Sequence, residues 1–123
     1  MSVSKRILLI DDEKEFLAIL KDALEMRDYE VTAVSNAVEA GMELAGTLPG
    51  LILMDVRMPG IDGLQACEAI RRNPVTKSIP IIVISALEDE SYKKQARKLD
   101  VAEYFVKPVD IEKLMRKIKE ILG

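Results

Sequence analysis

The chain has 123 residues, enough for one domain with a single hydrophobic core but too few for two, so we treat residues 1–123 as one domain. A net charge of −3 offers no basic field for tight nonspecific nucleic-acid binding, and the absence of histidine excludes imidazole as a base or a metal ligand. The single cysteine, Cys67, permits no internal disulfide, and the longest apolar run, residues 16–20, cannot cross a bilayer, so we expect a cytoplasmic protein without direct membrane or nucleic-acid contact.

The predicted elements alternate between short apolar runs and longer amphipathic stretches. In chain order, a strand at 7–10 precedes a helix at about 13–27, a strand at 30–34 precedes a helix near 37–47, and a strand at 51–54 precedes a helix near 63–72. A strand at 81–84, a helix near 88–98, a strand at 104–106 and a C-terminal helix with apolar positions from 111 to 122 follow. Unbroken apolar runs suit strands buried on both faces, so this order predicts an α/β domain with a parallel sheet.

Polar side chains follow the predicted strands at the points where these end. Asp11 and Asp12 come after the first strand, and Asp55 follows the third. Ser85 follows the fourth strand and Lys107 the fifth. Because ligands of open parallel sheets bind beyond the carboxyl ends of the strands, these residues predict one polar site at that edge.

Each of these residues has a simpler interpretation when it is taken alone. Asp12 and Glu15 form a plausible helix-capping pair, and Asp55 suits an Asx turn. Ser85 suits a turn, and Lys107 a solvated surface charge. None of this explains three acids at one edge, where carboxylates repel and raise one another's pKa values. Lys107 offsets part of that charge, and oxygen-only ligands favour Mg²⁺, with Mn²⁺ as the alternative, over zinc or calcium.

The same set of groups fits phosphoryl transfer to a carboxylate. A carboxylate oxygen can accept a phosphoryl group to form an acyl phosphate, and the protein then positions groups and neutralises charge on the phosphoryl oxygens. A metal ion, the Lys107 ammonium and the Ser85 hydroxyl would each serve one of these oxygens. Asp55 is the best nucleophile, because its strand lies between the acid pair and the Ser85–Lys107 pair.

Four separated stretches resemble the receiver domain of two-component response regulators, the CheY-like family. They are ILLIDDE at 7–13, LILMDVRMPGIDG at 51–63, PIIVISA at 80–86 and YFVKP at 104–108. The resemblance covers essentially the whole chain, with the motifs in the same order and spacing. It implies a flavodoxin-like, doubly wound (βα)5 fold with a five-stranded parallel sheet in strand order 2-1-3-4-5.

The resemblance also implies the roles of the acids. Asp55 corresponds to the phospho-acceptor, and Asp11 and Asp12 to the acid pair. Asp12 and Asp55 would bind Mg²⁺ directly, Asp11 would bind it largely through water, and the Arg57 backbone carbonyl would be a further ligand. The phosphodonor would be a phosphohistidine on a histidine kinase or a histidine phosphotransfer protein.

A conformational switch is a further implication. Ser85 corresponds to the Ser or Thr that contacts the phosphoryl group, Lys107 to the motif lysine before a cis Pro108, and Tyr104 to the aromatic switch position. Phosphorylation would change the surface formed by the fourth helix, the fifth strand and the last helix, which would control a downstream protein or effector domain or form a dimer. Asp100 stands where the family often has Gly in a left-handed backbone conformation.

Three other functions fit parts of the pattern. A haloacid-dehalogenase-type phosphatase also uses an aspartyl nucleophile, but it needs that residue after its first strand. A flavin or nucleotide binder would have a first loop rich in Ser, Thr or Gly, whereas residues 11–13 are all acidic. A nonreactive interaction module would have no need of the complete acid, Ser85 and Lys107 set. We therefore expect a phospho-accepting switch that takes part in its own phosphorylation and autodephosphorylation, not an enzyme acting on other substrates.

Overall fold

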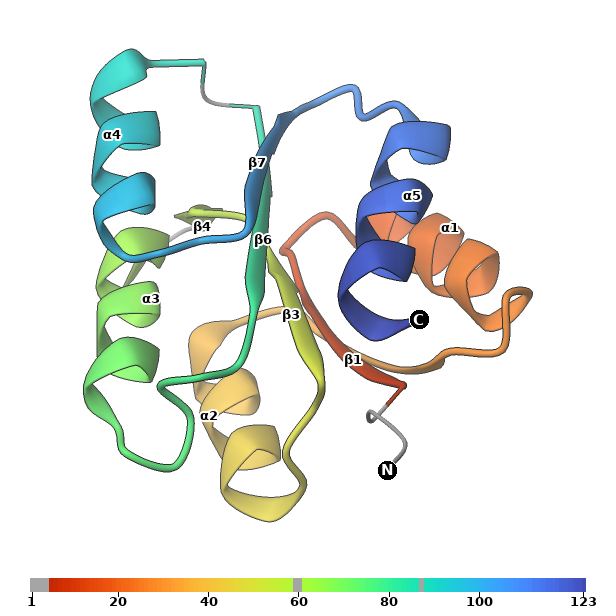
Figure 1. The fold of residues 1–123 in the computed structure, drawn as a ribbon, viewed down its shortest axis with the longest axis horizontal. Coiled ribbons are helices and arrows are strands. Elements are labelled where there is room, and N and C mark those ends of the chain that lie inside the picture. Colours follow the sequence, from red (N-terminus) through yellow and green to blue (C-terminus); the bar gives the residue numbers. More distant parts are fainter. Residues whose placement is uncertain (1–4, 59–60, 87) are drawn as a thin grey trace.

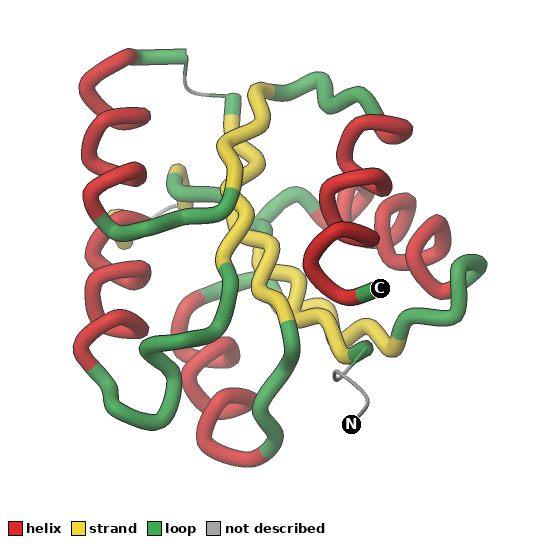
Figure 2. The backbone as a smooth tube through the Cα atoms, viewed as in Figure 1, coloured by secondary structure: helices red, strands yellow, loops and turns green. Residues whose placement is uncertain are grey.

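The computed structural model describes residues 5–58, 61–86 and 88–123, and a five-stranded parallel sheet lies at its centre (Figure 1, Figure 2). The strands are β1 (Arg6–Ile10), β2 (Glu30–Val34), β3 (Leu51–Met54), β6 (Ile81–Ser85) and β7 (Glu103–Val106). They lie in the order β2-β1-β3-β6-β7, which confirms the predicted flavodoxin-like order.

Helices cover both faces of the sheet. Figure 1 shows α2 (Ala37–Gly46), α3 (Gly63–Arg72) and α4 (Glu90–Lys98) on one face, and α1 (Lys14–Glu25) and α5 (Ile111–Leu122) on the other. All five helices begin and end within two residues of their predicted bounds. Among the described residues, none of the helices combines the length and apolar character that crossing a bilayer requires.

The sheet divides the hydrophobic core of this one domain into two layers, because successive side chains of a strand point to opposite faces. In β3, Ile52 and Met54 pack into the core beneath α2, α3 and α4, whereas Leu51 and Leu53 pack into the core beneath α1 and α5. These four side chains are at most 1% exposed. Burial of each one stabilises the fold by about 1.5–3 kcal/mol, so an unbroken apolar run is the sequence that this central strand requires.

A short hairpin interrupts the connection between β3 and α3. The sequence predicts a turn-rich loop at 58–63, but residues Arg57–Met58 form β4 and residues Ile61–Asp62 form β5, paired antiparallel. Residues 59 and 60, which include the predicted Pro-Gly turn, lie outside the described residues. The loop prediction was therefore wrong for the flanking residues, because the backbone pairing of two two-residue strands leaves no periodicity that a sequence pattern can reveal.

The backbone has two special conformations that the family resemblance implies. Asp100 has φ 58°, in the left-handed region, where Asp is better tolerated than most non-glycine residues. The Lys107–Pro108 peptide bond is cis.

Arg71, near the C-terminal end of α3, joins that helix to two loops. Its guanidinium donates hydrogen bonds to the carbonyls of Lys77 (3.0 Å) and Ile79 (2.7 Å) in the loop before β6. It also donates to the carbonyls of Leu99 (2.8 Å) and Asp100 (3.2 Å), which follow α4. The planar guanidinium can serve several carbonyls at once, so Arg71 ties the C-terminal end of α4 to α3.

We expect substitution by Ala to have opposite effects on the free energy of unfolding at two helical glycines. A Cβ on Gly63 would lie 2.7 Å from the carbonyl carbon and oxygen of Val56, whereas a Cβ on Gly41 would meet no atom within 4 Å. We expect Gly63→Ala to lower the free energy of unfolding by about 1–3 kcal/mol, because backbone has to move, and Gly41→Ala to raise it by about 0.5–1 kcal/mol. Denaturant titration of both variants measures the difference, and equal effects would contradict the close approach at Val56.

Candidate functional site

Strand register brings the predicted site residues to one edge of the sheet. Ile10 pairs with Met54, so the residues after them, Asp11 and Asp55, are neighbours. The Asp55 N–H donates to the Ile10 carbonyl at 3.0 Å, and the Lys107 N–H donates to the Ser85 carbonyl at 2.8 Å. The backbone of these residues is therefore held by the same hydrogen bonding that forms the sheet.

The three predicted acids form a compact cluster. Carboxylate oxygens of Asp11, Asp12 and Asp55 lie within 4.8 Å of one another. Asp11 and Asp55 are 1% and 5% exposed, whereas Asp12 lies at the surface. Carboxylate oxygens at this spacing are the donors that hard divalent cations prefer, so this set fits a Mg²⁺-type ion in the chemistry of its ligands.

The Lys107 ammonium lies among the carboxylates. Its Nζ donates to Asp11 Oδ2 at 2.7 Å, to Glu13 Oε1 at 3.0 Å and to Asp55 Oδ2 at 3.3 Å. The Phe16 ring adds a cation–π contact, with 4.4 Å from Nζ to the ring centroid. An ammonium has three N–H donors, so these acids engage all of them, and the Lys107 side chain is only 11% exposed.

Burial and ion pairing act in opposite directions on the two buried partners. Burial raises the pKa of Asp11, and the hydrogen bonds from Lys107 and from the Glu13 N–H only partly offset this effect. Burial would lower the pKa of Lys107, but hydrogen bonds to Asp11 and Glu13 and the charges of Asp11 and Asp55 raise it above its ordinary value. Lys107 therefore stays cationic at neutral pH, while its hydrogen bond and charge only partly offset the effect of burial on the pKa of Asp11.

Ser85 and Tyr104 meet on the neighbouring strands β6 and β7. Ser85 is fully buried, and a hydrogen bond joins it to the partly buried Tyr104 side chain. Burial raises the pKa of Tyr104 and the Asp55 charge adds to the rise, while the Ser85 hydrogen bond opposes it. Tyr104 is therefore close enough to the acidic cluster to be influenced by its charge.

The start of α1 differs from the capping interpretation of Asp12. Glu13 is the N-cap residue and its side chain makes no capping hydrogen bond; instead Asp11 Oδ1 accepts the Glu13 N–H at 2.9 Å. The Asp12–Glu15 capping pair was therefore wrong. Glu13 is the residue of this site that strand-end reasoning missed, because it lies three residues beyond the strand and reaches Lys107 only through its long side chain.

Arg57, predicted to offer its backbone carbonyl to a metal, lies two residues after Asp55 at the start of β4. Its pairing partner in the hairpin is Asp62. The role of the Arg57 carbonyl stays a prediction.

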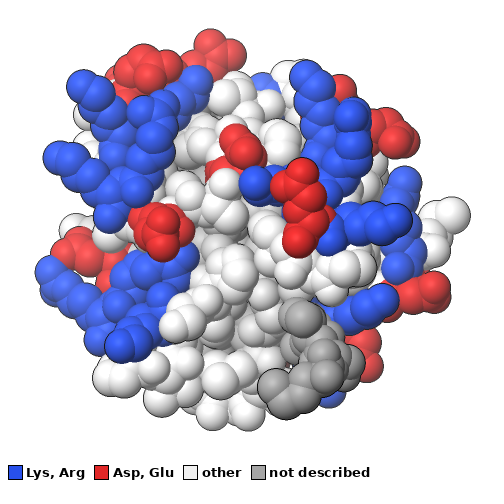
Figure 3. Space-filling view, in the orientation of Figure 1, with Lys and Arg blue, Asp and Glu red and all other residues white. Residues whose placement is uncertain are grey.

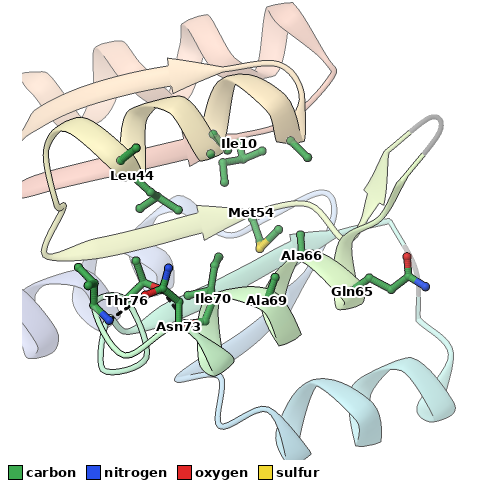
Figure 4. A pocket seen from close by; sticks show the side chains of 14 residues that line it. Ile10, Leu44, Met54, Gln65, Ala66, Ala69, Ile70, Asn73 and Thr76 are labelled. Carbon is green, nitrogen blue, oxygen red and sulfur yellow. Dashed lines mark hydrogen bonds between the residues drawn. The ribbon is translucent and has the colours of Figure 1, made fainter.

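An apolar hollow of about 600 Å³ lies between α2 and α3, apart from the acidic cluster (Figure 4). Ile10 and Met54 form part of its wall, together with small residues such as Ala66 and Ala69. None of the described residues that line it has a titratable side chain. This hollow therefore offers no group for acid–base or phosphoryl-transfer chemistry.

Basic side chains gather on the helices away from the acidic cluster. Figure 3 shows Lys and Arg grouped over α4 and the neighbouring part of α3, with acids interspersed. On α4, the side chains of Lys94, Arg97 and Lys98 are exposed. The negative pocket and these positive surfaces are separate features of a chain whose net charge is only −3.

Comparisons with known proteins by sequence and by structure lead to one family. The response regulator receiver domain family matches residues 7–119. Protein PilH of Pseudomonas aeruginosa is 30% identical over 118 residues, which cover 96% of this chain and 98% of PilH. The crystal structure of a response regulator receiver protein from Pseudomonas putida superposes with a TM-score of 0.92 at 26% identity and covers 98% of this chain and 99% of that one.

Some relatives are longer than this chain. The phosphate regulon transcriptional regulatory protein PhoB of Rhizobium meliloti is 31% identical over 117 residues, which cover 95% of this chain but only 52% of PhoB. The match spans 26% of the response regulator PleD of Caulobacter vibrioides. The chain thus corresponds to about half or less of these two relatives.

Neutralising one acid of the cluster should stabilise the protein when no divalent cation is present. We expect Asp12→Asn to raise the free energy of unfolding by about 0.2–1 kcal/mol in a chelator, because it removes repulsion from Asp11 and Asp55. Asp22→Asn makes the same chemical change at an exposed position of α1 and should leave stability nearly unchanged. Thermal unfolding at low ionic strength provides the measurement, and an Asp12→Asn protein less stable than wild type would contradict the repulsion.

Proposed function

Because the chain belongs to the response regulator receiver domain family, we propose that Asp55 accepts a phosphoryl group from a phosphohistidine on a histidine kinase or phosphotransfer protein. Receiver domains are phospho-accepting switches of two-component signalling. The observation that carries the assignment to Asp55 is its position: it is nearly buried, its oxygens lie within 4.8 Å of those of two further acids, and Lys107 Nζ lies 3.3 Å from Asp55 Oδ2.

The transfer exchanges one bond of phosphorus for another. An Asp55 carboxylate oxygen forms a bond to phosphorus, the bond from phosphorus to the donor imidazole nitrogen breaks, and that nitrogen keeps the electron pair. No oxidant or reductant is needed. Lys107 places positive charge beside the accepting oxygen, which favours the approach of an anionic phosphoryl group and stabilises the acyl phosphate. In the autodephosphorylation that we propose, a water oxygen would bond to phosphorus, the bond from phosphorus to the Asp55 oxygen would break, and inorganic phosphate would leave.

A magnesium ion fits the remaining donors, with Mn²⁺ as the alternative. Asp12 and Asp55 would bind it directly, together with the Arg57 backbone carbonyl. Asp11 would bind through water, because its Oδ2 accepts from Lys107 and its Oδ1 accepts from the Glu13 N–H. When bound, the ion supplies positive charge that offsets the acids and the phosphoryl oxygens.

Ser85 and Tyr104 connect the reaction to the surface. A phosphoryl oxygen on Asp55 would compete with Tyr104 for the Ser85 hydroxyl, and so would change the favoured position of the Tyr104 ring. This couples the site to the face formed by α4, β7 and α5, which would bind a downstream protein or effector domain or a second phosphorylated copy. The shift can be no larger than the difference in interaction free energy between the two states.

Loss of the acceptor oxygen should abolish labelling. We expect Asp55→Asn to lose essentially all phosphorylation by acetyl phosphate, measured as a mass increase on the intact protein, because the amide is a poor nucleophile. Asp22→Asn is the matched control and should be labelled like wild type. Full labelling of Asp55→Asn would place the acceptor elsewhere, and repeated turnover of small phosphate esters by wild type would instead favour a phosphatase of the haloacid-dehalogenase type.

Binding of a divalent cation should be visible as stabilisation. We expect millimolar Mg²⁺ to raise the unfolding temperature of wild type, because ligand binding to the folded state alone adds RT ln(1 + [L]/Kd) to its stability. Asp12→Asn should gain less, since it lacks one direct ligand, and EDTA should reverse both gains. Equal gains for the two proteins in differential scanning fluorimetry would argue against Asp12 as a ligand.

A further inference from the structure

The three acids that hold Lys107 differ in how easily each can release it. We propose that the Glu13 carboxylate restrains Lys107 in the unphosphorylated protein and releases it to the phosphoryl group, so that Glu13 limits how fast Asp55 is phosphorylated. Glu13 is then a positioning residue that acts through Lys107. This inference rests on the proposed role of Asp55 as the acceptor.

The hydrogen bonds of Lys107 leave it no free donor in the unphosphorylated protein. Nζ lies 2.7 Å from Asp11, 3.0 Å from Glu13 and 3.3 Å from Asp55, so the contact to the acceptor itself is the longest of the three. A phosphoryl oxygen on Asp55 needs one of these donors to have its charge offset. One existing partner of Lys107 therefore has to give way.

Of the three acids, Glu13 is the one whose contact with Lys107 costs the least free energy to break. Asp11 is buried, and its other oxygen is fixed by the Glu13 N–H at 2.9 Å, so release of Lys107 would leave a buried carboxylate charge without its cation. The Glu13 side chain is 61% exposed and makes no capping hydrogen bond, so water can replace Lys107 there. Asp11 and the Phe16 ring still hold the ammonium after Glu13 leaves.

Glu13 also has a direct electrostatic effect on the phosphodonor. Its carboxylate shares the Lys107 ammonium with Asp55, so it adds negative charge where an anionic donor must approach. Both effects, the occupied donor and the added charge, slow the transfer. Loss of Glu13 should therefore speed phosphorylation, whereas loss of a residue that positions Lys107 productively would slow it.

Three substitutions distinguish the effect of the Glu13–Lys107 contact from the effect of the negative charge of Glu13. With acetyl phosphate, an Asp55 oxygen bonds to phosphorus, the bond from phosphorus to the acetate oxygen breaks, and acetate leaves with the electron pair. We expect Glu13→Gln to speed this labelling about two- to fivefold, the range for one exposed ion pair. Glu13→Asp keeps the charge on a side chain one methylene shorter, too short for the Lys107 contact, and should show most of the acceleration. Glu15→Gln removes an exposed charge from the first turn of the same helix and should match wild type.

Each other result has a definite meaning. Equal or slower labelling of Glu13→Gln, with wild type and Glu15→Gln labelled on Asp55, would overturn the restraint and leave the proposed function intact. An accelerated Glu13→Gln with a wild-type rate for Glu13→Asp would assign the effect to charge alone and overturn the role of the contact. Absence of labelling in wild type would remove the proposed function, and this inference with it. Thermal unfolding of each variant confirms that the compared proteins are folded.

Discussion

A single ammonium ion surrounded by carboxylates is the interaction on which the site depends. Lys107 approaches the acids of β1 and β3 from the end of β7, at the far edge of the sheet. Without it, the buried Asp11 and Asp55 would lose the ammonium with which both of them form ion pairs. The fold accepts this concentration of charge because the backbone of each participant is fixed by the sheet and cannot move apart to relieve repulsion. The three carboxylates that it holds at this edge are close enough together to bind a metal ion.

Most of the fold and the site could be predicted from the sequence because two simple periodicities specify them. Four-residue apolar runs occur at strands that are buried on both faces, as in β3, and the parallel register then aligns the residues that follow. Asp11 and Asp55 meet for this reason, and Ser85 and Lys107 join them from the next two strands. The specific identity of the site came from the resemblance of four motifs and is supported by the family match over residues 7–119.

The remaining features of the fold and the site depend on how far side chains extend and on local backbone pairing. A periodic pattern in the sequence indicates neither of these. Glu13 contacts Lys107 from the N-cap position of α1, and Phe16 contacts it from the first turn of that helix. Arg57–Met58 and Ile61–Asp62 are paired as antiparallel strands of only two residues each. The 600 Å³ hollow between α2 and α3 arises where alanines and Gly41 face one another, and its existence depends on the separation of the two helices.

The hydrogen bonds of Arg71 make the two ends of α4 unequal in mechanical terms. The carbonyls of Leu99 and Asp100, just after α4, are bound to α3 through one guanidinium, whereas the N-terminal end of α4 follows the loop that leaves Ser85. A displacement that began at Ser85 would therefore reach α4 at the end opposite the Arg71 hydrogen bonds, and the helix would be expected to rotate about its C-terminal end. Such a displacement would be expected to be largest at Asp89 and Glu90, the residues at the N-terminal end of α4.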